Sequence, residues 1–279
     1  MGMIEANGAR FGYDEAGEGP AVVLLHAGLA DRRMWDHQFT ALAESHRVIR
    51  YDRRGHGESD DPEGTVSHHR DLLAVMDALG VEEAALVGSS MGGAYSLDAA
   101  LAAPSRVRRI ALVGAGLSGH EWPADMAAGM QAALQAAVPL DRLEQYRAHT
   151  AERVDEADVA AAAEANARYF VVGPHRTPDV LDEQTWLAAK EMCAVVYHRM
   201  WNGPKWTEDV PDTRHRLAGI TAPALVLIGL ADASGLLALA DLFTTTIPGA
   251  RRLDLPDTGH LPPMERPAET TEALLEFLA

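Results

Sequence analysis

The stretch from Ala84 to Gly93, AALVGSSMGG, constrains the fold more than any other part of the chain. An apolar run typical of a β-strand leads into Gly88–Gly92, which fits the pattern G-x-S-x-G, and a helical pattern begins at Gly93. In such a strand–turn–helix unit the central serine is pushed out at the tip of a strained turn, and the flanking glycines leave room where strand and helix cross closely. We therefore predict that Ser90 is a presented nucleophile rather than part of a plain Gly/Ser loop.

The same turn predicts a binding site for negative charge beside Ser90. The amide of Met91 falls at the N-terminus of the following helix, where unpaired N–H groups and the helix dipole favour an anionic oxygen. Met91 is therefore predicted to supply one amide of an oxyanion hole.

Composition narrows the classes of partner. The chain has 279 residues, is 47% hydrophobic and carries a formal charge of −17, so it can bury a sizeable core and should be repelled by nucleic acid and by anionic membranes. This repulsion leaves a small, neutral molecule as the expected partner. The chain has no apolar run of 18 residues and no leader-like start, which predicts a cytoplasmic protein. The single cysteine, Cys193, lies in an apolar helical stretch and is predicted to be buried rather than to hold a metal. Monomer and homodimer both stay open.

Strand-like and helix-like segments alternate over residues 1–118 and again over 216–279. The strand-like runs are apolar on both faces, which predicts an α/β fold with a mostly parallel sheet covered by helices on both faces. The 119–215 stretch between them contains no convincing strand and has four helical patterns, within 126–137, 141–153, 156–170 and 183–201. We predict that this stretch is an inserted helical cap over the carboxyl ends of the strands, where such sheets bind ligands.

A serine nucleophile needs a base, and the base needs an orienting acid. Asp232 ends the strand-like run ALVLIGLAD, and His260 follows the last strand in DTGHLPP, so both are expected at the same sheet edge as Ser90. Asp257 and Glu121 are the alternative acids.

On these residues the chain resembles the α/β-hydrolase fold family. The motifs that carry the resemblance are His26-Ala27-Gly28 with Trp35, the loop from Asp52 to Ser59, the elbow around Ser90, Gly229 to Asp232, and Gly259-His260 with Glu265 and Pro267. The resemblance implies that Gly28 supplies the second oxyanion amide and that the loop from Asp52 is a structural turn. Ala27 departs from the usual glycine, and the proline common after the acid is missing.

Within the family, Ser90 disfavours dehalogenases and epoxide hydrolases, which use aspartate at this position, and Leu261 replaces a tryptophan common in carbon–carbon bond hydrolases. The resemblance is greatest to bacterial carboxylesterases and enol-lactonases. It implies hydrolysis of a carboxylic ester or lactone of a small, neutral, apolar molecule through an acyl-enzyme, with no cofactor or metal. A slowly turning-over ligand sensor, and perhydrolase, carbon–carbon hydrolase or lyase chemistry, remain alternatives.

The 119–215 stretch carries large apolar side chains that can serve either as its own core or as a pocket wall. We expect Leu29, Trp122, Met126 and Leu261 to contact the substrate. This stretch contains few basic residues placed to hold a carboxylate or phosphate, and the whole chain is acidic. We therefore predict that neutral substrates are preferred over anionic ones unless an arginine such as Arg176 or Arg199 lines the pocket.

Overall fold

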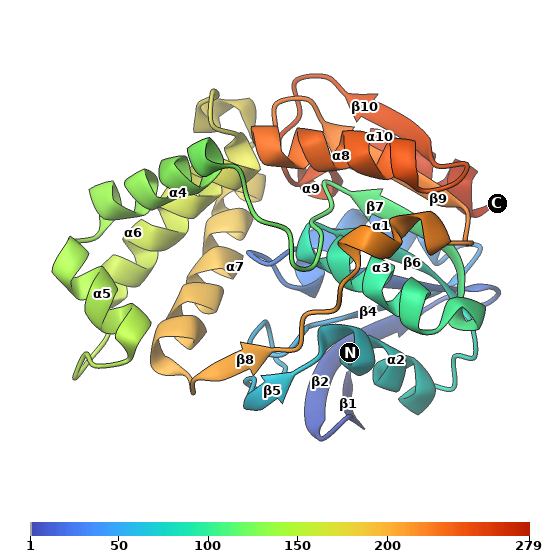
Figure 1. Cartoon of the computed structure of the whole chain (residues 1–279), viewed down its shortest axis with the longest axis horizontal. Coiled ribbons are helices and arrows are strands. Elements are labelled where there is room, and N and C mark those ends of the chain that lie inside the picture. Colours follow the sequence, from blue (N-terminus) through green and yellow to red (C-terminus); the bar gives the residue numbers. More distant parts are fainter. Residues whose placement is uncertain (1) are drawn as a thin grey trace.

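The computed structural model describes residues 2–279 and contains, within them, an eight-stranded sheet of order β1-β2-β4-β3-β6-β7-β9-β10 (Figure 1). Neighbouring strands pair in parallel from β4 to β10, whereas β1 pairs antiparallel with β2, and β2 with β4. The strands are β1 Gly2–Ala6, β2 Ala9–Ala16, β3 Ala21–Leu25, β4 Arg47–Tyr51, β6 Ala84–Ser89, β7 Val107–Val113, β9 Ala224–Gly229 and β10 Arg251–Leu255. The predicted mostly parallel sheet is confirmed.

Helices cover both faces of this sheet. Helices α2, α3 and α8 share a buried cluster with one face, and α1 and α10 share another with the opposite face. The helices are α1 Asp36–Leu42, α2 His68–Ala78, α3 Met91–Ala102, α4 Ala124–Ala137, α5 Leu140–Ala148, α6 Glu156–Asn166, α7 Glu183–Asn202, α8 Ser234–Thr246, α9 Pro262–Glu265 and α10 Pro267–Leu278.

Strand β3 shows why the sheet is covered on both sides. Val23 and Leu25 belong to the cluster with α2, α3 and α8, whereas Val22 and Leu24 belong to the cluster with α1 and α10. Successive side chains of a strand point to opposite faces, so a continuous apolar run has to be buried twice. Each such side chain contributes about 1.5–3 kcal/mol when fully buried, and this drives helices onto both faces.

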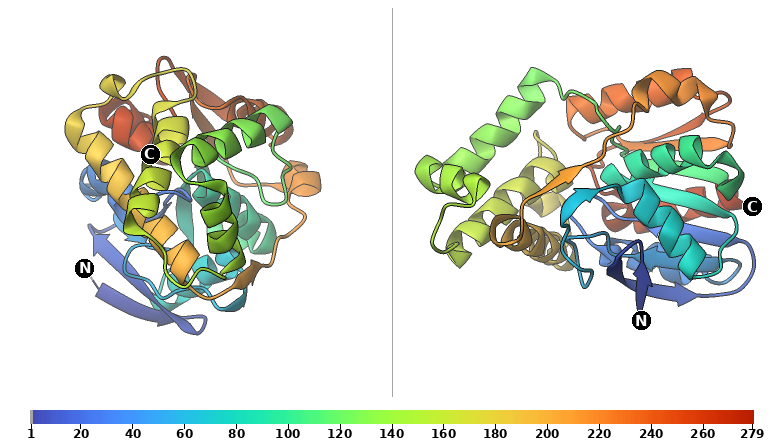
Figure 2. Two further views of the ribbon diagram at one scale, coloured as in Figure 1. Left: turned by 90° about the vertical axis from the view of Figure 1, so that its left-hand side faces the viewer. Right: turned by 60° about the horizontal axis from the view of Figure 1, so that its bottom comes forward.

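Helices α4 to α7 lie between β7 and β9 in sequence and form a separate group beside one end of the sheet (Figure 2). We call residues 119–215, which contain them, the helical insertion. It has a buried cluster of its own, which includes Leu134, Leu143, Tyr146 and Trp201. Cys193 lies in this cluster at 1% exposure, as predicted. All four predicted helices are present.

Three short strands were not predicted. The helical insertion does contain a strand, β8 Trp206–Glu208, which pairs in parallel with β5 Gly64–Val66. Three residues are too few for alternation to be visible in a sequence, so the prediction of no strand there was wrong. Strand β1 was also missed, although Asn7 and Gly8, with φ of 45° and 74°, form the Asn-Gly turn that signals a hairpin.

Candidate active site

Ser90 lies in the sharp turn between β6 and α3. Its φ of 51° and ψ of −118° are values that residues other than glycine rarely adopt. A Cβ added to Gly88 would lie 2.4 Å from the carbonyl oxygen of Gly92, and one added to Gly92 would lie 2.3 Å from that of Leu25. The turn therefore excludes side chains at both glycines, which agrees with the predicted strand–turn–helix unit.

Asp232 and His260 meet at the carboxyl edge of the sheet. Asp232 follows β9, and His260 follows β10, in the loop before α9. The Asp232 Oδ2 to His260 Nδ1 distance is 2.7 Å, and both side chains are buried. Gly114, with φ of 51°, passes so close that a Cβ there would lie 3.3 Å from His260 Nδ1, so the backbone after β7 helps to hold the pair.

The contacts of the pair determine which ring nitrogen carries the proton. A carboxylate only accepts hydrogen bonds, so Nδ1 of His260 donates to Asp232. The other carboxylate oxygen, Oδ1, accepts from the amide of Ala233 at 2.7 Å. Nε2 of His260 is therefore the nitrogen left to accept a proton. No hydrogen bond joins it to the Ser90 hydroxyl within residues 2–279; such contacts are often long in the absence of substrate.

The two alternative acids are exposed. Neither Asp257 nor Glu121 makes a hydrogen bond to His260 within the part of the chain that the structure describes. Asp257 lies in a turn with φ of 51°, and its carbonyl oxygen accepts a hydrogen bond from Arg176. Asp232 is thus the acid that contacts His260.

Gly28 and Met91 line the same cavity as Ser90. Gly28 follows β3, and Met91 is the first residue of α3. A Cβ on Gly28 would lie 3.3 Å from Met91 Cγ, so the two residues are neighbours. Neither amide donates a hydrogen bond to another group of residues 2–279. Both N–H groups are consequently free to bind an oxygen atom.

Ser90 and His260 line a cavity of about 300 Å³. The predicted residues Gly28, Met91, Leu29, Trp122, Met126 and Leu261 all line it. Ala127, Asn166, Val171, Val196 and Leu236 also line it and were missed, because which side of a helix faces a cavity depends on packing rather than on residue type. The cavity is mostly apolar.

The large apolar side chains of the helical insertion divide between two roles. Met130, Phe170, Tyr197 and Met200 line the cavity, and the Phe170 ring lies 5.6 Å from that of His260. Trp201 belongs instead to the insertion's own core, and Met192 and Trp186 pack in the cluster with α1 and α10.

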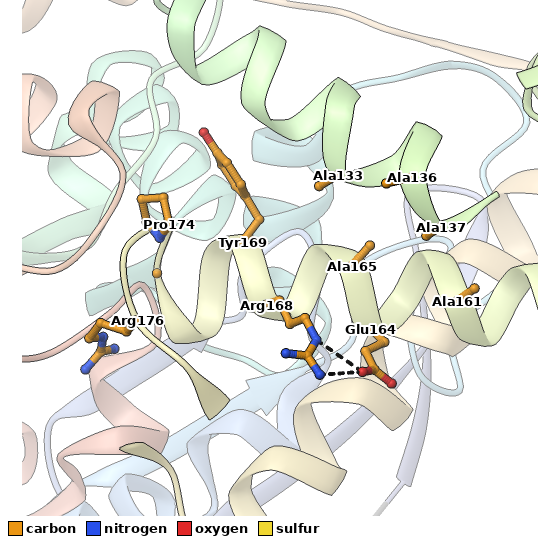
Figure 3. Close-up of a pocket in the computed structure, with 11 residues that line it drawn as sticks. Ala133, Ala136, Ala137, Ala161, Glu164, Ala165, Arg168, Tyr169, Pro174 and Arg176 are labelled. Carbon is orange, nitrogen blue, oxygen red and sulfur yellow. Dashed lines mark hydrogen bonds and ion pairs between the residues drawn. The ribbon is translucent and has the colours of Figure 1, made fainter. Parts of the chain in front are cut away.

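The two arginines named from the sequence lie outside this cavity. Arg176 forms an ion pair with Glu265 at 2.6 Å and borders a separate hollow of about 550 Å³ between α4 and α6, which is lined largely by alanines (Figure 3). Arg199 borders a second cavity next to the first. The cavity that contains Ser90 therefore has no arginine or lysine among its lining residues within 2–279.

None of the helices within residues 2–279 combines the length and the apolar character of a membrane span. The same residues contain no cluster of three or more His, Cys, Asp or Glu side chains that could bind a metal ion.

This fold and this edge of the sheet define a class of protein. The sequence profile of the alpha/beta hydrolase fold matches residues 20–267. The chain belongs to the α/β hydrolase fold family.

Individual relatives share about a quarter of their residues with this chain. The chain is 26% identical to the proline iminopeptidase of Heyndrickxia coagulans, over 99% of this chain and 98% of the relative. It is 27% identical to 3-oxoadipate enol-lactonase 1 of Acinetobacter baylyi, over 93% and 88%. The crystal structure of the enol-lactonase from Burkholderia xenovorans LB400 superposes with a TM-score of 0.76 at 26% identity, over 99% of both chains. These relatives and this structural neighbour support hydrolase activity and a resemblance to enol-lactonases, while the names of the relatives differ in the bond that is attacked.

Proposed function

We propose that this hydrolase cleaves a carboxylic ester or lactone through an acyl-enzyme on Ser90. The observation that carries the proposal is the buried Asp232–His260 contact of 2.7 Å, made at the cavity that also contains Ser90 in its strained turn. His260 Nε2 accepts the Ser90 proton, the hydroxyl oxygen attacks the carbonyl carbon, and the proton then passes to the leaving oxygen. Asp232 keeps the imidazole oriented and stabilises its protonated form.

The amides of Gly28 and Met91 are the proposed oxyanion hole. Both residues line the cavity and neither amide donates a hydrogen bond within residues 2–279, and the helix dipole of α3 adds positive potential at Met91. Removing one such donor in other serine hydrolases costs roughly 10²–10³ in kcat. A water molecule deprotonated by His260 then attacks the acyl-enzyme and releases the acid.

We also propose that the helical insertion acts as a cap and selects the substrate. Trp122, Met126 and Met130 from the insertion and Leu29 and Leu261 from the core surround the site with apolar atoms. A charge placed there loses its hydration without gaining a partner. The group next to the reacting carbonyl is therefore small, neutral and apolar. We expect 4-nitrophenyl butyrate to be hydrolysed with a higher kcat/KM than the 4-nitrophenyl half-ester of succinic acid, which has the same chain length and a negative charge.

Replacing Ser90 tests the nucleophile. Ser90→Ala should abolish hydrolysis of 4-nitrophenyl butyrate while the thermal unfolding temperature stays close to that of the wild type, because the side chain leaves no large cavity. Intact-mass measurement after a fluorophosphonate probe should show one adduct on the wild type and none on the variant. Retained activity in Ser90→Ala, or labelling elsewhere, would contradict the assignment.

The turnover number of the wild type on 4-nitrophenyl butyrate distinguishes an enzyme from a ligand sensor that hydrolyses its ligand slowly. A hydrolase should turn over at about 1 per second or faster on a good substrate. A burst of one equivalent followed by no further product would favour the sensor.

A further inference from the structure

A second cavity of about 220 Å³ adjoins the one that contains Ser90. The two cavities share Gly28, Met91, Val196 and Met200 as lining residues, so they meet at the proposed oxyanion hole. The wall of the second cavity is formed in part by Arg53.

Arg53 is a buried cation without a contacting anion. Its exposure is 3%, and no carboxylate oxygen of residues 2–279 lies within 4.0 Å of its guanidinium. The other arginines of this cavity are paired, Arg54 with Asp71 at 2.8 Å and Arg199 with Asp61 at 3.4 Å. A buried charge normally has a partner, because desolvation without one is costly.

The hydrogen bonds of Arg53 also leave capacity unused. Its Nη2 makes two long contacts of 3.3 Å, to the carbonyl oxygen of Ala27 and to His56 Nε2, and its Nε is buried with no partner. A guanidinium offers five N–H donors. Beside it, His68 Nδ1 is likewise buried and without a partner.

No group around Arg53 forms an ion pair with it within residues 2–279. Burial, together with the charge of Arg53, lowers the pKa of His56 to about 3 and that of His68 to about 2, so both rings are neutral. The Tyr95 ring lies 5.1 Å from the guanidinium carbon. Glu208 acts on Arg53 through its charge but makes no ion pair with it, and burial raises the pKa of Glu208.

We propose that the second cavity is a subsite for a carboxylate of the substrate, held by Arg53 at some distance from the ester. This rests on the proposed function and deepens it: the end next to Ser90 is apolar, and the far end is anionic. A single unpaired guanidinium suits a singly charged, planar carboxylate, which it can bind through two parallel N–H groups, better than a phosphate dianion. The preference for neutral groups then holds only for substrates too short to reach Arg53.

The length dependence of wild-type activity is the first test. We would measure kcat/KM for 4-nitrophenyl half-esters of succinic, adipic, suberic and sebacic acids against the neutral butyrate, hexanoate, octanoate and decanoate. Because Gly28 and Met91 line both cavities, either the acyl side or the alcohol side of an ester could reach the second cavity. A second set of substrates therefore carries the carboxylate on the alcohol side: acetate esters of ω-hydroxy acids, with the corresponding methyl esters as neutral controls. In one of the two sets, the charged substrate should have a lower kcat/KM than the neutral substrate of equal length when the chain is short. At a longer chain length the charged substrate should have the higher kcat/KM.

Substitution of Arg53 is the second test. Arg53→Gln should lower kcat/KM for the best carboxylate substrate roughly 10- to 100-fold, mainly through KM, because a charge-assisted hydrogen bond is lost. The kcat/KM for the neutral substrate of equal length should fall by a clearly smaller factor, so the ratio of the two kcat/KM values is the quantity that tests the subsite. Arg53→Lys keeps the charge and should restore part of the difference. Arg168→Gln removes an exposed arginine of the helical insertion and is the matched control.

The outcomes are distinguishable. Hydrolysis of neutral esters with no chain length at which the carboxylate helps would overturn the subsite and leave the proposed function intact. An equal loss on charged and neutral substrates in Arg53→Gln would assign Arg53 a structural role and also overturn it. If neither series were hydrolysed by the wild type, the proposed function itself would fail. Should Arg53→Gln not fold, the wild-type length dependence still decides.

Discussion

Asp232 owes its proposed role to one contact that the other acidic candidates lack. Its two carboxylate oxygens are engaged, one by His260 and one by the amide of Ala233, so the imidazole is held in a single orientation. Asp257 and Glu121 are exposed and make no such contact within residues 2–279.

Asp232→Asn should therefore reduce kcat on neutral esters by up to roughly 10⁴, because the amide stabilises the wrong imidazole tautomer. Asp257→Asn and Glu121→Gln are the matched controls and should each change kcat less than about threefold. A larger loss in Glu121→Gln than in Asp232→Asn would move the acid to the segment after β7.

The element that follows Ser90 also connects the core to both ends of the helical insertion. Asp98 lies on α3 at 3% exposure and accepts hydrogen bonds from the hydroxyls of Ser118 and Thr213. Ser118 lies where the chain leaves the core, and Thr213 lies where it returns. Helix α3 is thus tied to both connections by one buried carboxylate.

This carboxylate makes stability depend on pH. Burial raises the pKa of Asp98 from 3.8 to about 6. An acid with a raised pKa in the folded state contributes stability below its unfolded pKa and loses it as the pH rises through the folded value. The free energy of unfolding of the wild type relative to Asp98→Asn, which does not titrate, should therefore fall by up to about 3 kcal/mol between pH 4 and pH 7.

Urea unfolding at pH 4, 5, 6 and 7 would measure this difference. Asp141→Asn, at an exposed position of α5, controls for the change in net charge. A difference between wild type and Asp98→Asn that stays constant over this range would show that Asp98 titrates normally.

At the scale of the whole molecule, Cys193 reports whether the separate core of the helical insertion stays closed, because it lies in that core. Burial raises the pKa of the Cys193 thiol to about 12, and the thiolate is the reactive form. Ellman's reagent should label Cys193 in the native protein at least about 100-fold more slowly than in urea. Fast labelling under native conditions would show that the thiol is accessible and would contradict a stably packed core of the insertion.

The local parts of the site were accessible from the sequence because they depend on short segments. Glycines around Ser90 are required by the close crossing of β6 and α3, and continuous apolar runs predicted strands that are buried on both faces. Once the strands are parallel, residues that follow them lie at one edge, which brings Asp232 and His260 near Ser90.

Tertiary structure alone decided which side chains face the cavities. Met130 and Met192 are both methionines on helices of one insertion, yet Met130 lines the Ser90 cavity and Met192 is buried in the cluster that includes α1 and α10, because helix rotation is set by packing. Arg53 is a clearer example of a feature that the sequence does not reveal. The family resemblance implied only that it lies in a structural turn, among other charged residues. Only the folded chain shows that its neighbours Arg54 and Arg199 have carboxylate partners while Arg53, buried beside neutral rings, has none among residues 2–279, because pairing is a property of distances between segments that lie far apart in the sequence.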